Sequence, residues 1–241
     1  MINSYISIDL ETTGLDPKLD KITEIGAIYV ENGEEIRSFS TLVNPGRKLE
    51  KRIVELTGIR DEDLANAPYI EEVLPKLMEF MEELPLLGHG VLFDYSFLKK
   101  AAVNQKLCFE RKAVDTLRIA RRYLQNLESR SLPNLCIHYG IGHHAHRALN
   151  DAQATHELYE RLVREFGNCP DAEEVFFPKP LLYRVKRDTP ATNAQKEQLT
   201  RLLTEQGIVL DVDVERLTRS EASRYVDRIK SGALSRSDAP E

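Results

Sequence analysis

The most informative stretch of this chain reads Asp9-Leu10-Glu11-Thr12-Thr13-Gly14-Leu15. It follows directly on a β-rich run, residues 5–8, which predicts a strand that ends in two acids. Alternate side chains of a strand share a face, so Asp9 and Glu11 lie beside each other. Two such carboxylates repel unless a cation neutralises them, which points to a divalent metal bound through oxygen. Taken alone, the pair also fits a frayed strand end with two solvated acids.

The composition is that of an ordinary soluble protein, with 241 residues, 41% hydrophobic and 30% charged. This length accommodates one full domain and a smaller appendage. No stretch approaches a membrane span, and the N-terminus lacks the form of a signal peptide. The three cysteines (Cys108, Cys136 and Cys169) form no CxxC pair, which favours reduced thiols over disulfides or a zinc site. We therefore expect a cytoplasmic protein without membrane association.

The formal net charge of the chain is −6. A protein that binds polyanions by bulk attraction is usually basic. If this protein acts on nucleic acid, it must therefore bind it locally, through metal and a few basic positions.

Periodicity predicts an α/β fold that begins with three strands in meander order. An Asn32-Gly33 pair between two β-rich runs is the strongest short hairpin signal, because both turn positions need positive φ. We expect strands at residues 5–11, 24–30, 36–43, 86–89 and 112–115. Helical stripes alternate with the later strands, including residues 70–81 and 148–166. Helices should therefore cover both faces of the sheet.

The chain divides by composition into three parts. Residues 1–167 form the main domain, and residues 168–189 read as an irregular, proline-rich linker that packs against it. Residues 190–234 form a small helical module with two predicted capping boxes, Thr192 with Gln195 and Thr218 with Glu221.

Two further acids and a histidine fall at the ends of predicted elements. Asp94 follows the fourth strand at the start of a helix, and Asp151 lies in the first turn of the long helix. His146 precedes Asp151 by five positions, in the loop before that helix. Ends of neighbouring elements in one α/β sheet can converge, so these residues and the Asp-x-Glu pair are candidates for one catalytic centre.

Four stretches of the chain, in order, resemble the motifs of the DEDDh 3′–5′ exonucleases. They are residues 9–15, 54–64, 89–94 and 146–151, and the likeness covers residues 4–166. Within that family the chain is similar to the proofreading epsilon subunit of bacterial DNA polymerase III and to the exonuclease domain of the Gram-positive replicative polymerase. The resemblance implies a ribonuclease H-like exonuclease fold, with a mixed central sheet flanked by helices and, here, a small C-terminal helical appendage.

The resemblance also implies a two-metal mechanism. By it, Asp9, Glu11 and Asp151 hold one Mg²⁺ or Mn²⁺, while Asp9 and Asp94 serve a second. Two such ions stabilise the attacking and leaving oxygens of an in-line displacement. His146 is expected to accept the proton of the attacking water, since an unperturbed histidine with a pKa of about 6.5 is available as a neutral base at cellular pH. We expect the adjacent His143 and His144 to be surface residues.

By the same resemblance, several residues contact the terminal nucleotide. These substrate-binding candidates are Thr12, Thr13, Leu15, His89, Phe93 and His146. For Leu15, simple core packing is the alternative interpretation. The chain departs from the family at Gly90, where the family usually has asparagine, and this affects the expected nucleotide preference rather than the chemistry.

The function predicted is a metal-dependent 3′–5′ exonuclease that releases nucleoside 5′-monophosphates from single-stranded or frayed DNA 3′ ends, in proofreading or repair. An exoribonuclease that trims RNA or short oligonucleotides would share every catalytic residue. An inactive nucleic-acid-binding scaffold would be expected to have lost an acid, yet all four acids and the histidine are present. Residues 190–234 could dock a DNA polymerase or another replication or repair protein, grip substrate, or cover the main domain.

Overall fold

The computed structural model describes residues 1–143 and 145–234. The described residues divide into two compact units. The first comprises Met1–Pro45 and Leu49–Val185, and the second comprises Gly46–Lys48 and the residues from Lys186 onward. Among the described residues, no helix has both the length and the apolar character needed to cross a bilayer.

The described part of the first unit is built on a mixed sheet of six strands in the order β3-β2-β1-β4-β5-β6. The strands are β1 (Tyr5–Thr12), β2 (Ile22–Glu31), β3 (Glu34–Leu42), β4 (Leu86–Gly88), β5 (Lys112–Asp115) and β6 (Lys179–Pro180). β1, β2 and β3 form the predicted antiparallel meander, while β4 runs parallel to β1 and β5 parallel to β4. The hairpin prediction is confirmed, because Asn32 and Gly33 have φ of 53° and 85°.

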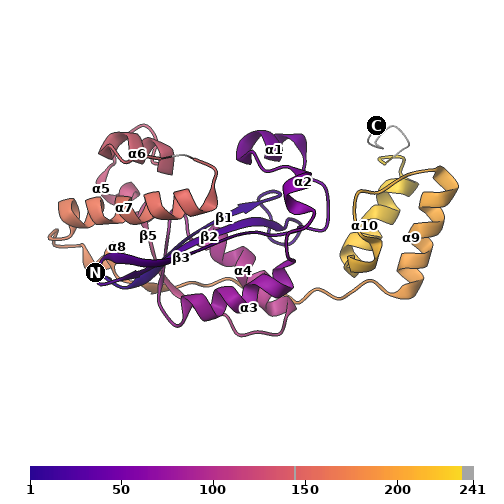
Figure 1. Ribbon diagram of the computed structural model, residues 1–241, viewed down its shortest axis with the longest axis horizontal. Coiled ribbons are helices and arrows are strands. Elements are labelled where there is room, and N and C mark those ends of the chain that lie inside the picture. The colour runs from indigo at the N-terminus through magenta and orange to yellow at the C-terminus, as the bar shows by residue number, and fades with distance from the viewer. Residues whose placement is uncertain (144, 235–241) are drawn as a thin grey trace. The chain divides into compact units, whose positions relative to one another are not determined.

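Helices flank the sheet on both faces, as Figure 1 shows. The helices of the first unit are α1 (Lys51–Thr57), α2 (Asp61–Leu64), α3 (Ile70–Met81), α4 (Leu92–Asn104), α5 (Thr116–Tyr123), α6 (Leu132–Tyr139), α7 (Ala148–Phe166) and α8 (Glu173–Phe176). One core contains Ile6, Ile8 and Leu10 of β1 together with residues of α3 and α4. The other contains Tyr5 of β1 together with residues of α5, α6 and α7. The predicted fold class, a mixed sheet between helices, is confirmed.

The alternation along β1 decides which way its acids point. Tyr5 and Ser7 face α7, since the Tyr5 hydroxyl lies 2.8 Å from His156 Nδ1 and the Ser7 hydroxyl donates to the Ala152 carbonyl at 2.7 Å. Asp9 and Glu11 are the next residues on that face. The strand therefore directs both carboxylates toward the N-terminal end of α7.

Residues 168–185 are more ordered than their composition indicates. They contain α8 and β6, and β6 pairs with β5 in antiparallel register. Val175 and Phe176 are buried in the core on the α7 side. A strand of two residues that includes Pro180 shows no periodicity, so the sequence could not reveal it.

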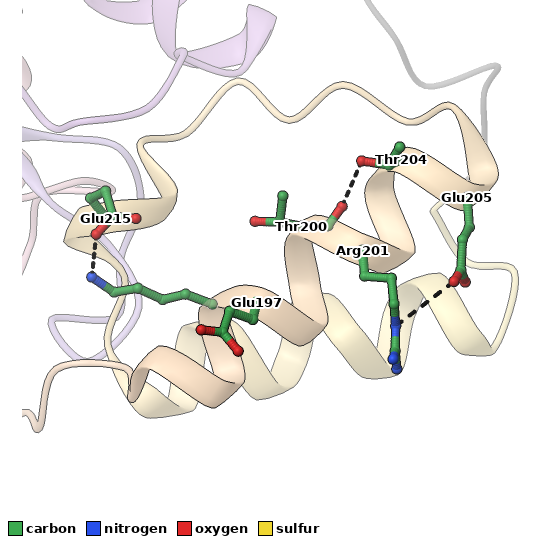
Figure 2. A pocket seen from close by; sticks show the side chains of 7 residues that line it. Glu197, Thr200, Arg201, Thr204, Glu205 and Glu215 are labelled. Atoms are coloured by element: carbon green, nitrogen blue, oxygen red, sulfur yellow. Dashed lines mark hydrogen bonds and ion pairs between the residues drawn. The ribbon is translucent and has the colours of Figure 1, made fainter.

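The described part of the second unit contains α9 (Asn193–Gln206), a 3₁₀ turn η1 (Val214–Arg216) and α10 (Arg219–Lys230). Both predicted capping boxes are confirmed. The backbone N–H of Gln195 donates to the Thr192 hydroxyl at 3.2 Å, and that of Glu221 donates to the Thr218 hydroxyl at 3.2 Å. A small core of its own buries Leu199, Ala222 and Ile229. A shallow groove along α9 has charged residues that pair with one another, Lys196 with Glu215 at 2.6 Å and Arg201 with Glu205 at 3.7 Å (Figure 2).

Candidate active site

The structure brings together three of the four predicted acids. Carboxylate oxygens of Asp9 and Glu11 on β1 and of Asp151 on α7 lie within 4.8 Å of one another. Asp151 is buried, and the other two are partly exposed. The strand contributes two oxygens on one face, and the first turn of the helix contributes the third from 140 positions along the chain.

Asp94, the fourth acid, lies beside this group in the first turn of α4. It is 4% exposed, and its Oδ1 accepts the backbone N–H of Leu10 at 3.1 Å. Leu10 lies between Asp9 and Glu11, so the Asp94 carboxylate is hydrogen-bonded to the stretch of backbone that carries the other two acids. Burial raises the pKa of Asp94 to about 8, although hydrogen bonds from backbone N–H groups oppose that shift.

The acids strongly perturb one another. Burial raises the pKa of Asp9 well above its usual range, and the nearby charges of Asp94 and Asp151 raise it further. Burial and the charge of Asp151 also raise the pKa of Glu11 to about 7. A cluster of oxygen donors whose charged forms repel fits a hard divalent cation, which removes the repulsion and prefers oxygen ligands. Asp9, Glu11 and Asp151 can therefore hold a metal ion.

The histidine loop differs from the sequence-based expectation. His143, expected at the surface, has a side chain only 6% exposed, and its Nε2 forms a hydrogen bond with Asp151 Oδ1. That expectation was wrong because a run of histidines in a polar loop gives no signal of which ring turns inward. His144 lies outside the described residues.

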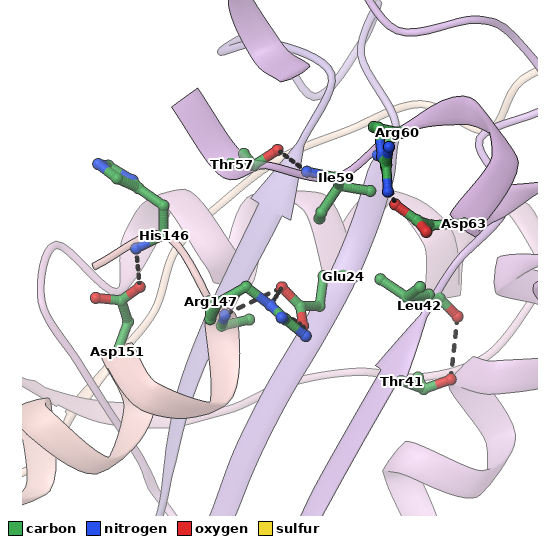
Figure 3. Close-up of polar contacts among 11 residues, drawn as sticks. Glu24, Thr41, Leu42, Thr57, Ile59, Arg60, Asp63, His146, Arg147 and Asp151 are labelled. Atoms are coloured by element: carbon green, nitrogen blue, oxygen red, sulfur yellow. Dashed lines mark hydrogen bonds and ion pairs between the residues drawn. The ribbon is translucent and has the colours of Figure 1, made fainter. Parts of the chain in front are cut away.

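His146 contacts the same carboxylate through its backbone. Its N–H donates to Asp151 Oδ2 at 2.9 Å, and its φ is 68°, in the left-handed region. Figure 3 shows the imidazole directed away from the Asp151 carboxylate. Asp151 thus accepts hydrogen bonds from the loop on both oxygens.

The end of β1 and the loop after it hold three of the predicted nucleotide-contacting residues in two different ways. Thr12 and Thr13 are buried, and their hydroxyls bond within the loop, that of Thr12 to the Gly14 carbonyl at 2.6 Å and that of Thr13 to Asp20 at 3.3 Å. Leu15 is 84% exposed. The alternative of core packing for Leu15 is therefore wrong, and its apolar side chain faces solvent four residues after Glu11.

His89 and Phe93 are both partly enclosed by the protein. The Nδ1 of His89 lies 2.9 Å from the Thr116 hydroxyl, and its Nε2 lies 2.8 Å from the Arg130 carbonyl. Burial lowers the pKa of His89, which favours the neutral ring. Phe93 packs against Phe97 with ring centroids 5.0 Å apart. With both ring nitrogens engaged inside the protein, His89 has only its ring face left for a substrate.

Gly90 occupies a position with a conformational requirement. Its φ is 83°, and its N–H donates to Asp115 Oδ1 at 2.8 Å. Glycine adopts positive φ without steric cost, and asparagine is among the residues most enriched there. The residue found here and the family's usual asparagine therefore suit the same backbone.

Comparisons with known proteins agree with this geometry. The sequence profile of the RNase_T family, described as exonuclease, matches residues 6–159. The chain belongs to this exonuclease family. The prediction of an exonuclease domain related to the DNA polymerase III exonucleases is thereby confirmed.

Two relatives illustrate how far the likeness of this exonuclease domain extends. The DNA polymerase III subunit epsilon of Aquifex aeolicus is 35% identical over 164 residues, which are 67% of this chain and 81% of that protein. The PolC-type DNA polymerase III of Thermotoga petrophila is 39% identical over 164 residues, 66% of this chain. The chain spans only 12% of the length of that polymerase.

Solved structures share the fold of the exonuclease domain. Exonuclease X in complex with 5′ overhanging duplex DNA superposes with a TM-score of 0.56 and 26% identity, covering 71% of this chain and 96% of that one. The nuclease domain of 3′hExo, a DEDDh family member bound to rAMP, has a TM-score of 0.58 at 21% identity, covering 68% of this chain and 93% of that one. The second likeness supports the fold alone.

One residue near the acids in the exonuclease domain escaped the sequence-based prediction. Glu24 of β2 is 2% exposed and accepts hydrogen bonds from Arg147 and from the Ala148 backbone N–H. The signal that could have revealed it is an acid at the start of an otherwise apolar strand. Such a residue is buried only when it is paired.

Proposed function

We propose that this protein is a metal-dependent 3′–5′ exonuclease that releases nucleoside 5′-monophosphates from DNA 3′ ends. The observation that carries the proposal is the meeting of Asp9, Glu11 and Asp151 within 4.8 Å in a chain of the exonuclease family. Asp94, bonded to the Leu10 backbone, completes the acidic set.

Two Mg²⁺ or Mn²⁺ ions suit this donor set. Asp9, Glu11 and Asp151 would hold one ion, and Asp9 with Asp94 would hold the other. Bound there, such ions lower the pKa of water and stabilise charge on the attacking and leaving oxygens. The four carboxylates would determine where the ions bind at the end of β1, and therefore where the reacting phosphate must lie.

His146 is the proposed general base. A neutral imidazole nitrogen of His146 would take the proton of the attacking water, because the residue stands five positions before Asp151, as in the family motif. The geometry makes His143 the rival, since its ring bonds to Asp151. Substituting each histidine separately distinguishes them.

The exposed Leu15 and the partly buried Phe93 are the proposed contacts for the terminal base. Leu15, four residues after Glu11, offers an apolar side chain that is 84% exposed. Thr12 and Thr13 shape the end of the strand and the loop after it through the hydrogen bonds of their hydroxyls. His89 would contribute its ring face.

The test is a nuclease assay on matched, 5′-labelled DNA and RNA oligonucleotides, with MgCl₂ or with chelator. We expect stepwise shortening from the 3′ end, faster on DNA, and no shortening in chelator. Faster degradation of RNA would favour the exoribonuclease alternative. Equal activity with and without chelator would overturn the metal assignment. The absence of any shortening in MgCl₂ would favour the inactive scaffold.

We also infer that the module at residues 190–234 docks a DNA polymerase or another replication or repair protein. Support comes from its own small core and from the names of the relatives, which are DNA polymerase III proteins. A chain that ends after Val185 should shorten free oligonucleotides at the full rate and fail to bind purified bacterial DNA polymerase III. Loss of nuclease activity in that chain would instead indicate that the module grips substrate.

A further inference from the structure

Glu24 is a buried carboxylate next to the acid cluster. It lies on β2 directly opposite Glu11 in the antiparallel register, and it is 2% exposed. Residues directly opposite in such a pair project from the same face of the sheet, which here is the face toward α7. A buried carboxylate is costly unless it is fully paired, so its partners indicate what it does.

Among the described residues, the hydrogen-bond donors to Glu24 are Arg147, the N-cap residue of α7, and Ala148, its first residue. Its Oε1 accepts from Arg147 Nη2 at 3.1 Å and from Arg147 Nε at 3.2 Å, and its Oε2 accepts from the Ala148 backbone N–H at 3.2 Å (Figure 3). The N-cap residue of this helix, Arg147, makes no capping hydrogen bond with its own side chain. Since the first N–H groups of a helix lack intrahelical acceptors, Glu24 supplies the missing cap from a strand.

Gly26 allows the helix to lie directly on the same strand. A Cβ at Gly26 would come within 2.1 Å of the carbonyl carbon of Ala148 and of the backbone nitrogen of Leu149. These are backbone atoms, so no side-chain rotation could relieve the clash. Gly26 is opposite Asp9 in the register, which means that the helix rests on the sheet beside the first metal-ligand candidate.

We propose that Glu24 is a positioning residue that fixes Asp151 relative to Asp9 and Glu11 by seating the N-terminus of α7 on β2. Asp151 follows Ala148 by three residues in the same first turn. A helix start held at Glu24 and Gly26 therefore determines how far Asp151 lies from β1 and in which direction its carboxylate points. The inference rests on the proposed metal site. The contacts of the α7 N-terminus with Glu24 and Gly26 determine how well the three carboxylates are arranged before the ion binds.

The test measures Mg²⁺ affinity directly, by thermal shift and by calorimetry with MgCl₂ on the full chain. Glu24→Gln keeps an oxygen for the Ala148 N–H and loses the charge pair with Arg147. We expect it to need about 10–100-fold more Mg²⁺, the usual range when a residue that orients metal ligands is altered. At saturating MgCl₂, its kcat should stay within a few-fold of that of the wild type.

Glu82→Gln is the matched control, because it removes a salt bridge of 2.7 Å to Arg37 between exposed side chains. Its Mg²⁺ affinity should equal that of the wild type. Arg147→Lys retains the charge but loses the two-pronged hydrogen bonding, and it should shift Mg²⁺ affinity in the same direction by a smaller factor. If Glu24→Gln does not fold, the Mg²⁺ affinity of Arg147→Lys still tests the positioning role.

Unchanged Mg²⁺ affinity in Glu24→Gln and Arg147→Lys, with only a lower melting temperature, would overturn the positioning role and leave a structural ion pair. A wild-type chain that neither binds Mg²⁺ nor shortens oligonucleotides would overturn the proposed function instead. The two failures are therefore distinguishable.

Discussion

β1 and the histidine loop at residues 142–147 both carry proposed catalytic side chains, yet they fix those side chains in different ways. β1 pairs with β2 on one side and β4 on the other, so its alternation directs Asp9 and Glu11 to one face. The described residues of the loop form no such ladder, and His146 adopts a φ of 68° with its ring directed away from Asp151. In a strand, the sequence alone indicates which way each side chain points. In a loop, the sequence indicates only which residues lie near the site.

The largest expected effect tests the strand side of this comparison. Asp9→Asn removes a charge shared by both proposed ions, whose stabilisation of the transition state is worth several kcal/mol, so kcat/KM should fall by about 10³-fold or more. Single-turnover assays on DNA in MgCl₂ measure it. Glu31→Gln, at the exposed end of β2, is the control and should be neutral. Wild-type activity in Asp9→Asn would remove Asp9 from the chemistry.

The loop side of the comparison is tested by His146→Ala and His143→Ala. Loss of a general base costs about 10²–10⁴-fold, and we expect that loss for His146→Ala alone. His143→Ala should leave kcat within a few-fold, since it loses a contact with Asp151 but no proton acceptor. The pH profile of kcat/KM of each variant checks this. The opposite ranking would transfer the base to His143, and equal large losses would show that both histidines are needed.

The contrast explains what could be predicted from the sequence. The meander, the Asn32-Gly33 turn and the acid pair follow from period-two alternation and turn chemistry, which are local. The approach of Asp151 to the strand depends on a helix seated at Gly26 and Glu24, a tertiary contact. The position of Asp151 at an element end made that approach possible, and the motif resemblance supported it, but neither identified the contact. The inward turn of His143 has no local determinant at all, so that prediction failed.

The acids themselves should make metal-free stability depend on pH. The folded-state pKa values of Glu11 and Asp94 are raised from 4.5 to about 7 and from 3.8 to about 8. At pH values between the unfolded-state and the folded-state pKa of each group, the folded state binds more protons than the unfolded state. The free energy of unfolding therefore falls as pH rises. Denaturation in chelator should therefore show declining stability from about pH 5 to about pH 8.

Adding MgCl₂ at the upper end of this range should restore stability, by about 2.7 kcal/mol at a hundred times the dissociation constant. Asp9→Asn should show a weaker pH dependence in chelator and little response to MgCl₂, because it removes a carboxylate whose own pKa is raised and which is a proposed metal ligand. A wild-type stability that is flat over this pH range, or equal with and without MgCl₂, would contradict the picture of mutually repelling ligands.

The smallest expected effect concerns Gly90, the position where the motif resemblance leads us to expect asparagine. A Cβ there would lie 3.7 Å from Leu117 Cδ2, an ordinary contact, so the only cost of a side chain is the φ of 83°. Asparagine tolerates this region, and Gly90→Asn should lose about 1 kcal/mol of stability or less. If the amide contacts the nucleotide, one added hydrogen bond of about 1 kcal/mol lowers KM for DNA about fivefold with kcat unchanged. Gly90→Ala carries the Cβ without the amide, so an identical KM in both variants would show that the amide has no part in binding.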